Sequence, residues 1–141
     1  MTLPEFDGLE AGQVIAERTI AIDRNTLVRY AGASGDFNPI HYREDVATSV
    51  GLPGVIAHGM LTMGTAVQPV SDWVGDPARV LDYQVRFTRP ILVEPQGAAE
   101  VTIQAKVGQL LAEERIARID LTVTFGGQTV LGKAQARVSF A

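Results

Sequence analysis

Apolar and polar residues alternate over most of the second half of the chain. The alternating runs cover residues 81–88, 99–107, 117–125 and 130–140. An apolar side chain at every second position is typical of strands that bury one face against a core. Short connections that carry glycine or proline join the runs, so we expect neighbouring strands to pair antiparallel as a meander. The segment 14–22 is predicted to add an earlier strand.

The middle of the chain follows a helical period instead. Between Met60 and Val74 the apolar residues recur at helical spacing, and Gly75 stands where a C-cap is expected. No charged residue precedes Asp72 in this segment, which predicts that most of the helix is buried. Pro69 lies inside the segment and is expected to bend or interrupt the helix.

Two shorter helices are predicted ahead of the long one. One covers about 24–33 and is capped by Asp23, and the other covers about 44–50 and ends at Gly51. The order of a strand, short helices, a long apolar helix and four strands favours one α+β domain over residues 1–141. An antiparallel sheet of about five strands wrapped around one long central helix is the hot-dog fold. A generic α+β sandwich is the alternative.

The composition of the 141 residues narrows the possible functions. Hydrophobic residues make up 46% and charged residues 20%, so the chain can bury a substantial core and is not a disordered segment. The net charge is −4 and no run of like charge exceeds two residues, so we expect no nucleic-acid or membrane-surface partner. No apolar stretch reaches the roughly 18 residues that a membrane helix needs.

Cysteine is absent, which excludes disulfides, thiolate metal ligands and a thiol nucleophile. A cysteine-free chain suits a reducing compartment, and the first residues lack the basic start and apolar run of a signal peptide. We therefore expect a cytoplasmic location.

Only two histidines occur, His41 and His58, and both lie outside the predicted strands. Asp36 and His41 are five residues apart, and Pro39 between them forbids a continuous helix and biases Asn38 toward an extended conformation. A bent loop can bring a carboxylate and an imidazole toward one point, as an acid–base pair requires. The alternative is that Asp36 caps the following turn and His41 is a surface residue.

The second histidine is followed by a glycine where the long helix is predicted to begin. Helix N-termini present unpaired N–H groups and the positive end of the helix dipole. Gly59 lets a ligand oxygen approach this backbone closely, as an oxyanion hole needs. The alternatives are that Gly59 only relieves crowding and that His58 is a packed, hydrogen-bonded histidine.

Other motifs that carry chemistry are missing from the sequence. The segment Gly32–Gly35 does not fit a nucleophile elbow, and neither a dinucleotide-binding motif nor a P-loop occurs. Two histidines seventeen residues apart without a clear third ligand make a weak metal site. We therefore expect neither a metal nor a cofactor.

Three stretches together resemble the MaoC-like, or R-specific hydratase 2, family. The most specific is the string Tyr30–His41, which contains Gly-Asp-Phe-Asn-Pro-Ile-His. The second is Ile56–Met60, and the third is Val85–Ile91, which is similar to the strand that lines the acyl pocket in that family. Within the family the chain is most similar to the HadB-type subunit of bacterial (3R)-hydroxyacyl-thioester dehydratases, through residues 57–64 and 73–77.

This resemblance implies a hydro-lyase of fatty-acid metabolism that interconverts trans-2-enoyl and (3R)-3-hydroxyacyl thioesters. It implies that Asp36 and His41 form the catalytic dyad, that Asn38 helps to fix their loop, and that the Gly59 N–H receives the thioester oxygen. It implies that coenzyme A or an acyl carrier protein carries the acyl group, and the sequence leaves open which of the two. The sequence leaves open which member of the dyad is the base and which is the acid.

His58, Arg86 and Arg89 are the candidate substrate-binding residues. The two arginines flank Phe87 on the strand that resembles the pocket wall, where a guanidinium can grip a phosphate, and the alternative is that both are solvated strand residues.

One sheet on one helix leaves an edge strand and apolar surface to cover, so we expect a homodimer, or a heterodimer with a hot-dog paralogue. A non-catalytic acyl-thioester-binding subunit and a hot-dog thioesterase are the rival functions.

Overall fold

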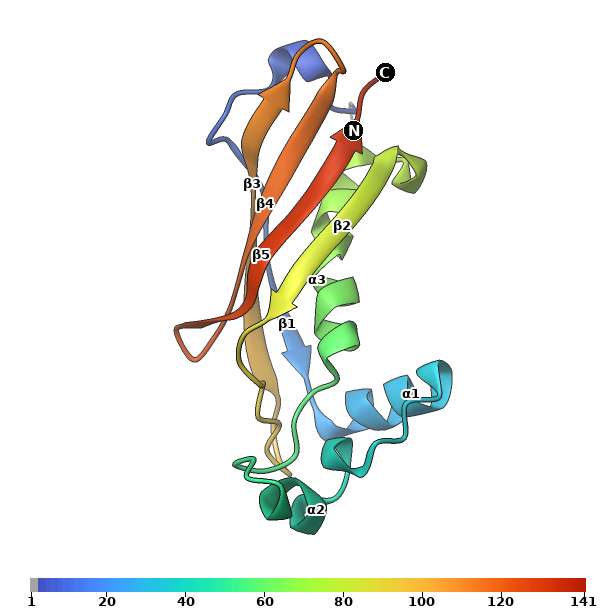
Figure 1. Cartoon of the computed structure of the whole chain (residues 1–141), viewed down its shortest axis with the longest axis vertical. Helices are drawn as coiled ribbons and strands as arrows, with labels where there is room; N and C mark the ends of the chain where they lie inside the picture. Colours follow the sequence, from blue (N-terminus) through green and yellow to red (C-terminus); the bar gives the residue numbers. More distant parts are fainter. Residues whose placement is uncertain (1–2) are drawn as a thin grey trace.

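The computed structural model describes residues 3–141, and it consists of one antiparallel sheet with a long helix packed along one face (Figure 1). The strands are β1 Val14–Ile22, β2 Val80–Phe87, β3 Ala99–Leu111, β4 Ile116–Phe125 and β5 Gln128–Ser139. The helices are α1 Arg24–Ser34, α2 Glu44–Ser49 and α3 Gly59–Val74, and 3-10 turns cover Phe6–Gly8, Pro39–His41 and Pro77–Arg79. The five-stranded sheet and its central helix confirm the predicted hot-dog fold.

The strands lie in the order β1-β3-β4-β5-β2, and every neighbouring pair is antiparallel. The predicted meander is confirmed for β3, β4 and β5, but it is wrong for β2, which pairs with β5 instead of β3. The segment 88–98 between β2 and β3 makes no tight turn. It crosses to the segment that precedes α3, where Ala57 N–H donates to the Ile91 carbonyl at 2.9 Å and Val93 N–H donates to the Val55 carbonyl at 2.9 Å.

Helix α3 packs its apolar side against the sheet and forms the centre of the core. Four residues of α3 at helical spacing remain exposed, so the expectation of a largely buried helix holds for one side only: Met60, Gly64, Gln68 and Asp72. Pro69 is buried, and the helix continues through it without interruption, contrary to one of the two predicted effects. Gly75 ends the helix in the left-handed conformation at φ 75°, as a C-cap does.

The short helices begin where the sequence predicted, and each ends within one residue of its predicted end. Asp23 accepts a hydrogen bond from the Thr26 N–H at 2.7 Å and caps α1, and α2 ends just before Gly51. Figure 1 shows α1 and α2 together at the end of the sheet opposite the C-terminus. No helix among residues 3–141 is long and apolar enough to cross a membrane.

Edge strand β2 departs from the strict alternation that its sequence suggests. Leu81 and Phe87, predicted to face the core, are 49% and 56% exposed. The register of β2 against β5 shifts twice, between Val80 and Asp82 and between Gln84 and Arg86. The first shift inserts Leu81 as an extra residue in β2 and changes the side of the sheet that it faces, as is common on edge strands. Phe87 stays on the side of α3, where its ring lies close to Gly59.

Candidate active site

The loop that follows α1 places Asp36 through hydrogen bonds of its own. Gly35 takes a left-handed conformation at φ 76° and turns the chain away from the helix. The Asp36 Oδ1 atom then accepts a hydrogen bond from the Asn38 N–H at 3.1 Å, and the Asn38 side chain accepts one from the Ile40 N–H at 3.2 Å. These two turns leave the second carboxylate oxygen, Oδ2, free to face His41.

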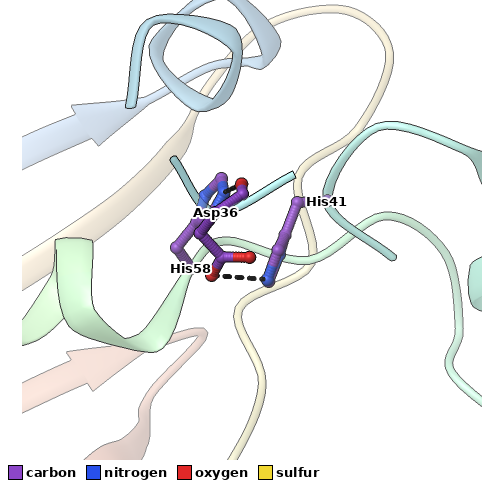
Figure 2. Close-up of side chains that lie close together, drawn as sticks. All are labelled: Asp36, His41 and His58. Atoms are coloured by element: carbon purple, nitrogen blue, oxygen red, sulfur yellow. Dashed lines mark hydrogen bonds and ion pairs between the residues drawn. The ribbon is translucent and has the colours of Figure 1, made fainter. Parts of the chain in front are cut away.

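His41 lies on the 3-10 turn, and its side chain is only 8% exposed. Its Nδ1 atom is 2.7 Å from the carbonyl oxygen of Ile56, so Nδ1 carries the proton and donates it. The other ring nitrogen, Nε2, lies 4.0 Å from Asp36 Oδ2 (Figure 2). The alternative considered from the sequence, in which His41 is a surface residue, is therefore wrong. One oxygen of Asp36 accepts the hydrogen bond of the turn, as the alternative expected, and the other oxygen faces the imidazole.

The buried His58 side chain contacts both members of this pair. Its ring is 1% exposed, stacks on the His41 ring with centroids 3.8 Å apart, and meets the edge of Tyr30 at 4.7 Å. Its Nε2 atom donates to the main-chain carbonyl of Asp36 at 3.2 Å, and within residues 3–141 its Nδ1 atom has no partner. Burial lowers the pKa of His58, so the neutral ring is favoured. These contacts fit the packed, hydrogen-bonded role considered for His58.

Asp36, His41 and His58 each bring a possible ligand atom within 4.8 Å of the others. The two imidazole rings, however, are nearly parallel, with an interplanar angle of 23°. Lone pairs in the planes of stacked rings run side by side and do not converge on one ion, as tetrahedral coordination would require. The arrangement favours hydrogen-bonding and proton-transfer roles for the three residues.

A cavity of about 360 Å³ opens beside His41. It is mostly apolar and is lined by Ile40, His41, Ile56, Ala57, Gly59, Thr62, Phe87, Thr88, Arg89, Pro90, Ile91, Val130 and Leu131. Gly59 is the first residue of α3, and no side chain caps that helix start. The first-turn N–H groups of a helix have no intrahelical acceptor, so this end of the cavity can receive a ligand oxygen.

Gly59 also has a packing role. A Cβ atom at this position would lie 2.9 Å from the Phe87 ring, closer than real Cβ contacts. Gly59 therefore does relieve crowding, and this role is compatible with the backbone's position on the cavity wall.

The two candidate arginines lie in different places. Arg89 lines the cavity beside His41, and its Nη1 atom donates to the Thr129 carbonyl at 3.0 Å. Arg86 is exposed and lines a separate cavity. The structure thus brings Asp36, Asn38, His41, His58 and Gly59 together, and it separates Arg86 from that group.

Three contributors to the site escaped the sequence argument. The Ile56 carbonyl, which orients His41, has no side-chain signal at all, and Thr62 is an ordinary core position of α3. Tyr30 stands in the recognised string, but its contact with His58 joins segments 28 residues apart and depends on the tertiary fold.

The sequence matches the family model described as "MaoC like domain" over residues 7–123. The chain belongs to the MaoC-like domain family. Every one of the site residues discussed above from Asp36 to Arg89 lies inside the matched range.

Relatives in this family are named for reactions of acyl thioesters. The 3-hydroxyacyl-thioester dehydratase X of Mycobacterium tuberculosis is 42% identical over 65 residues, which are 46% of this chain and 22% of that protein. The (R)-specific enoyl-CoA hydratase of Rhodospirillum rubrum is 27% identical over 140 residues, or 98% of this chain and 94% of that protein.

Among solved structures, a MaoC-like dehydratase superposes with a TM-score of 0.94 at 37% identity, over 99% of this chain and 43% of the other. This MaoC-like chain therefore spans about a fifth of dehydratase X and less than half of the solved dehydratase.

Proposed function

We propose that the protein catalyses the reversible hydration of a trans-2-enoyl thioester to the (3R)-3-hydroxyacyl thioester. The observation that carries the proposal is the Asp36–His41 pair, whose facing atoms stand 4.0 Å apart beside an apolar cavity. This gap is too long for a direct hydrogen bond and suits a water held between the two groups. The names of relatives in the family support the same reaction.

The proposed chemistry follows from what each group can do. Hydration adds the hydroxyl group of water to C3 of the enoyl chain and a proton to C2. The Nδ1–H bond to Ile56 leaves Nε2 of the neutral ring as a proton acceptor, and Asp36 Oδ2 is within reach of the same water. A carboxylate and an imidazole can together remove one proton and deliver the other, and positioned groups of this kind give about 10²–10⁴-fold acceleration.

Negative charge gathers on the thioester oxygen while C3 is attacked. We propose that the Gly59 N–H, at the positive end of α3, donates a hydrogen bond to this oxygen. The removal of one such donor in comparable sites costs about 3 kcal/mol of transition-state stabilisation. We propose that Asn38 fixes the loop by accepting a hydrogen bond from the Ile40 N–H.

The proposal extends to the acyl carrier, the second subunit and the cellular compartment. We propose that the acyl group arrives on coenzyme A or an acyl carrier protein, that Arg86 and Arg89 help to bind this carrier, and that two hot-dog subunits associate. The subunits are two copies of this chain or this chain with a paralogue, in the cytoplasm.

One assay with crotonyl-CoA separates the proposed function from its rivals. Loss of the enoyl absorbance without release of thiol indicates hydration, and this is the expected result. Release of free thiol would indicate a thioesterase, although residues 60–71 of the central helix contain no acid to act as its carboxylate. No change in either signal would indicate a non-catalytic binding subunit.

A further inference from the structure

Three short segments lie side by side next to the imidazole of His41: residues 40–41, 55–57 and 91–93. Backbone hydrogen bonds join the middle segment to both of the others, at 3.3 Å to residues 40–41 and twice at 2.9 Å to residues 91–93. The Ile56 carbonyl in the middle segment accepts the Nδ1–H of His41 at 2.7 Å. The orientation of the imidazole therefore depends on how these three segments are held.

The ladder between residues 55–57 and 91–93 ends at an arginine side chain. Arg24, the first residue of α1, donates from Nε to the Val93 carbonyl at 2.6 Å. In a longer antiparallel ladder this carbonyl would accept the Val55 N–H, but no such bond occurs among residues 3–141. Arg24 thus takes the place of the next backbone bond and ties the outer segment to α1.

The same guanidinium also reaches the segment that follows His41. Its Nη2 atom donates at 2.7 Å to Oε2 of Glu44, which is the first residue of α2 and lies three positions after His41. The Arg24 side chain is 25% exposed, so the carboxylate compensates a charge that is mostly buried. A Cβ atom at Gly54 would lie 2.6 Å from Glu44 Oε1, so glycine leaves the room that this carboxylate needs.

We propose that Arg24 is a positioning residue for His41. Through Glu44 it holds the chain that carries the donor, and through Val93 it holds the chain packed against the acceptor, Ile56. The Nδ1–H bond to Ile56 keeps the proton on Nδ1 and leaves Nε2 to accept a proton from water. This consequence for turnover rests on the proposed function. A displacement of about 1 Å at such a group can cost about a hundredfold in rate.

Two substitutions and a matched control test the role of Arg24. Arg24→Met removes both donors and keeps an unbranched side chain. Arg24→Lys keeps the charge beside Glu44 but replaces the planar fork with a single ammonium group, which serves two separate acceptors less well. Arg18→Met is the control, because Arg18 makes an ion pair of the same length, 2.7 Å, with Asp72 near the C-terminal end of α3.

The kinetic constants for crotonyl-CoA give the first readout. We expect kcat to fall about tenfold in Arg24→Met and about threefold in Arg24→Lys, because the imidazole is no longer held in one orientation. Arg24 does not line the cavity beside His41, so KM should stay within about twofold of the parent value. Arg18→Met should change neither constant.

An NMR readout separates positioning from a general loss of stability. The chain has only two histidines, and their hydrogen bonds favour opposite tautomers, with the proton on Nδ1 in His41 and on Nε2 in His58. Spectra of protein labelled at the histidine ring nitrogens distinguish these tautomers. At about pH 8 we expect Arg24→Met to turn the His41 pattern into a mixture of tautomers and to leave the His58 pattern as it is.

The inference falls if either kcat or the His41 tautomer stays as in the parent in Arg24→Met, or if Arg18→Met loses as much activity. If Arg24→Met does not fold, Arg24→Lys decides by the same two readouts. If the parent protein hydrates no substrate, the proposed function fails. The positioning role then stands if the His41 tautomer changes in Arg24→Met and not in Arg18→Met, and it falls if the tautomer is the same in all three proteins.

Discussion

His58 shows how much a single buried side chain contributes to the arrangement of the Asp36–His41 pair. Its Nε2 atom donates a hydrogen bond to the Asp36 carbonyl, and its ring stacks on the ring of His41. Burial lowers the pKa of the His58 imidazole. A histidine that is kept neutral in the folded protein takes up protons on unfolding, below the ordinary value of 6.5. Its contribution to stability is therefore complete above pH 6.5 and is lost as the pH falls below that value.

We predict that His58→Asn costs about 1–3 kcal/mol of folding free energy at pH 7.5, because it removes a buried ring and its contacts. We also predict that the parent loses more melting temperature than the variant between pH 7 and pH 5, since only the parent has a buried imidazole at this position that resists protonation. Thermal melts at a series of pH values measure both effects. Unchanged melting combined with a large fall in kcat would show that His58 acts in the chemistry and not as a support.

At this scale the sequence predicts what is local. Asp36, Asn38 and His41 could be grouped because Pro39 and the intervening residues force a bend within six positions. The stacking of His58 on His41 could not be predicted, because the two segments are joined by bonds to the main chain of Ile56 that no residue type signals.

At the scale of the elements, Gly59 at the start of α3 has both a packing role and a proposed role in the chemistry. Gly59 touches the Phe87 ring so closely that a methyl group has no room, but Phe87 is 56% exposed and can move aside. We predict that Gly59→Ala folds, with a melting temperature within a few degrees of the parent, and lowers kcat/KM for the crotonyl thioester at least about tenfold. The loss follows because the displaced ring and the added methyl group obstruct the donor N–H and the cavity.

Gly64→Ala provides the matched control on the same helix. Apart from the adjoining backbone of α3, no described atom lies within 4 Å of the Cβ that it would add, so alanine should raise stability by about 0.4–1 kcal/mol and leave kcat/KM unchanged. If Gly59→Ala kept the activity of the parent, the proposed donor at the start of α3 would have to be given up.

Most of the predicted helices and strands are present in the structure, whereas the pairing of the strands does not follow from the sequence alone. Period-two alternation reports which face of a strand is buried, and it placed β3, β4 and β5 correctly. It carries no information on partners, and the crossing of residues 88–98 puts β2 beside β5. The sequence also could not show that α3 continues through Pro69. Burial of the helix against the sheet outweighs the loss of one backbone hydrogen bond there.

At the scale of the whole molecule, the exposed edge of the sheet bears on assembly. Strand β2 is unpaired on one side and leaves Leu81 and Phe87 half exposed, which is a surface that a second hot-dog subunit could cover. We predict a dimer at micromolar concentration in light scattering, and a shift toward monomer in Leu81→Asp. Val14→Asp, on the opposite edge strand β1, is the control and should not change the mass. A parent protein that is monomeric at these concentrations would refute the prediction.

The central claim is that Asp36 and His41 act together on one water, and turnover of crotonyl-CoA by Asp36→Asn and His41→Gln tests it most directly. Asp36→Asn keeps the shape of the side chain, and His41→Gln keeps a polar side chain of similar length. Both remove the ability to exchange a proton, and the fold should persist by thermal melting. We predict that kcat falls at least about a hundredfold in each variant, in line with positioned acid–base groups. Near-normal turnover in either variant, with the fold intact, would contradict the account.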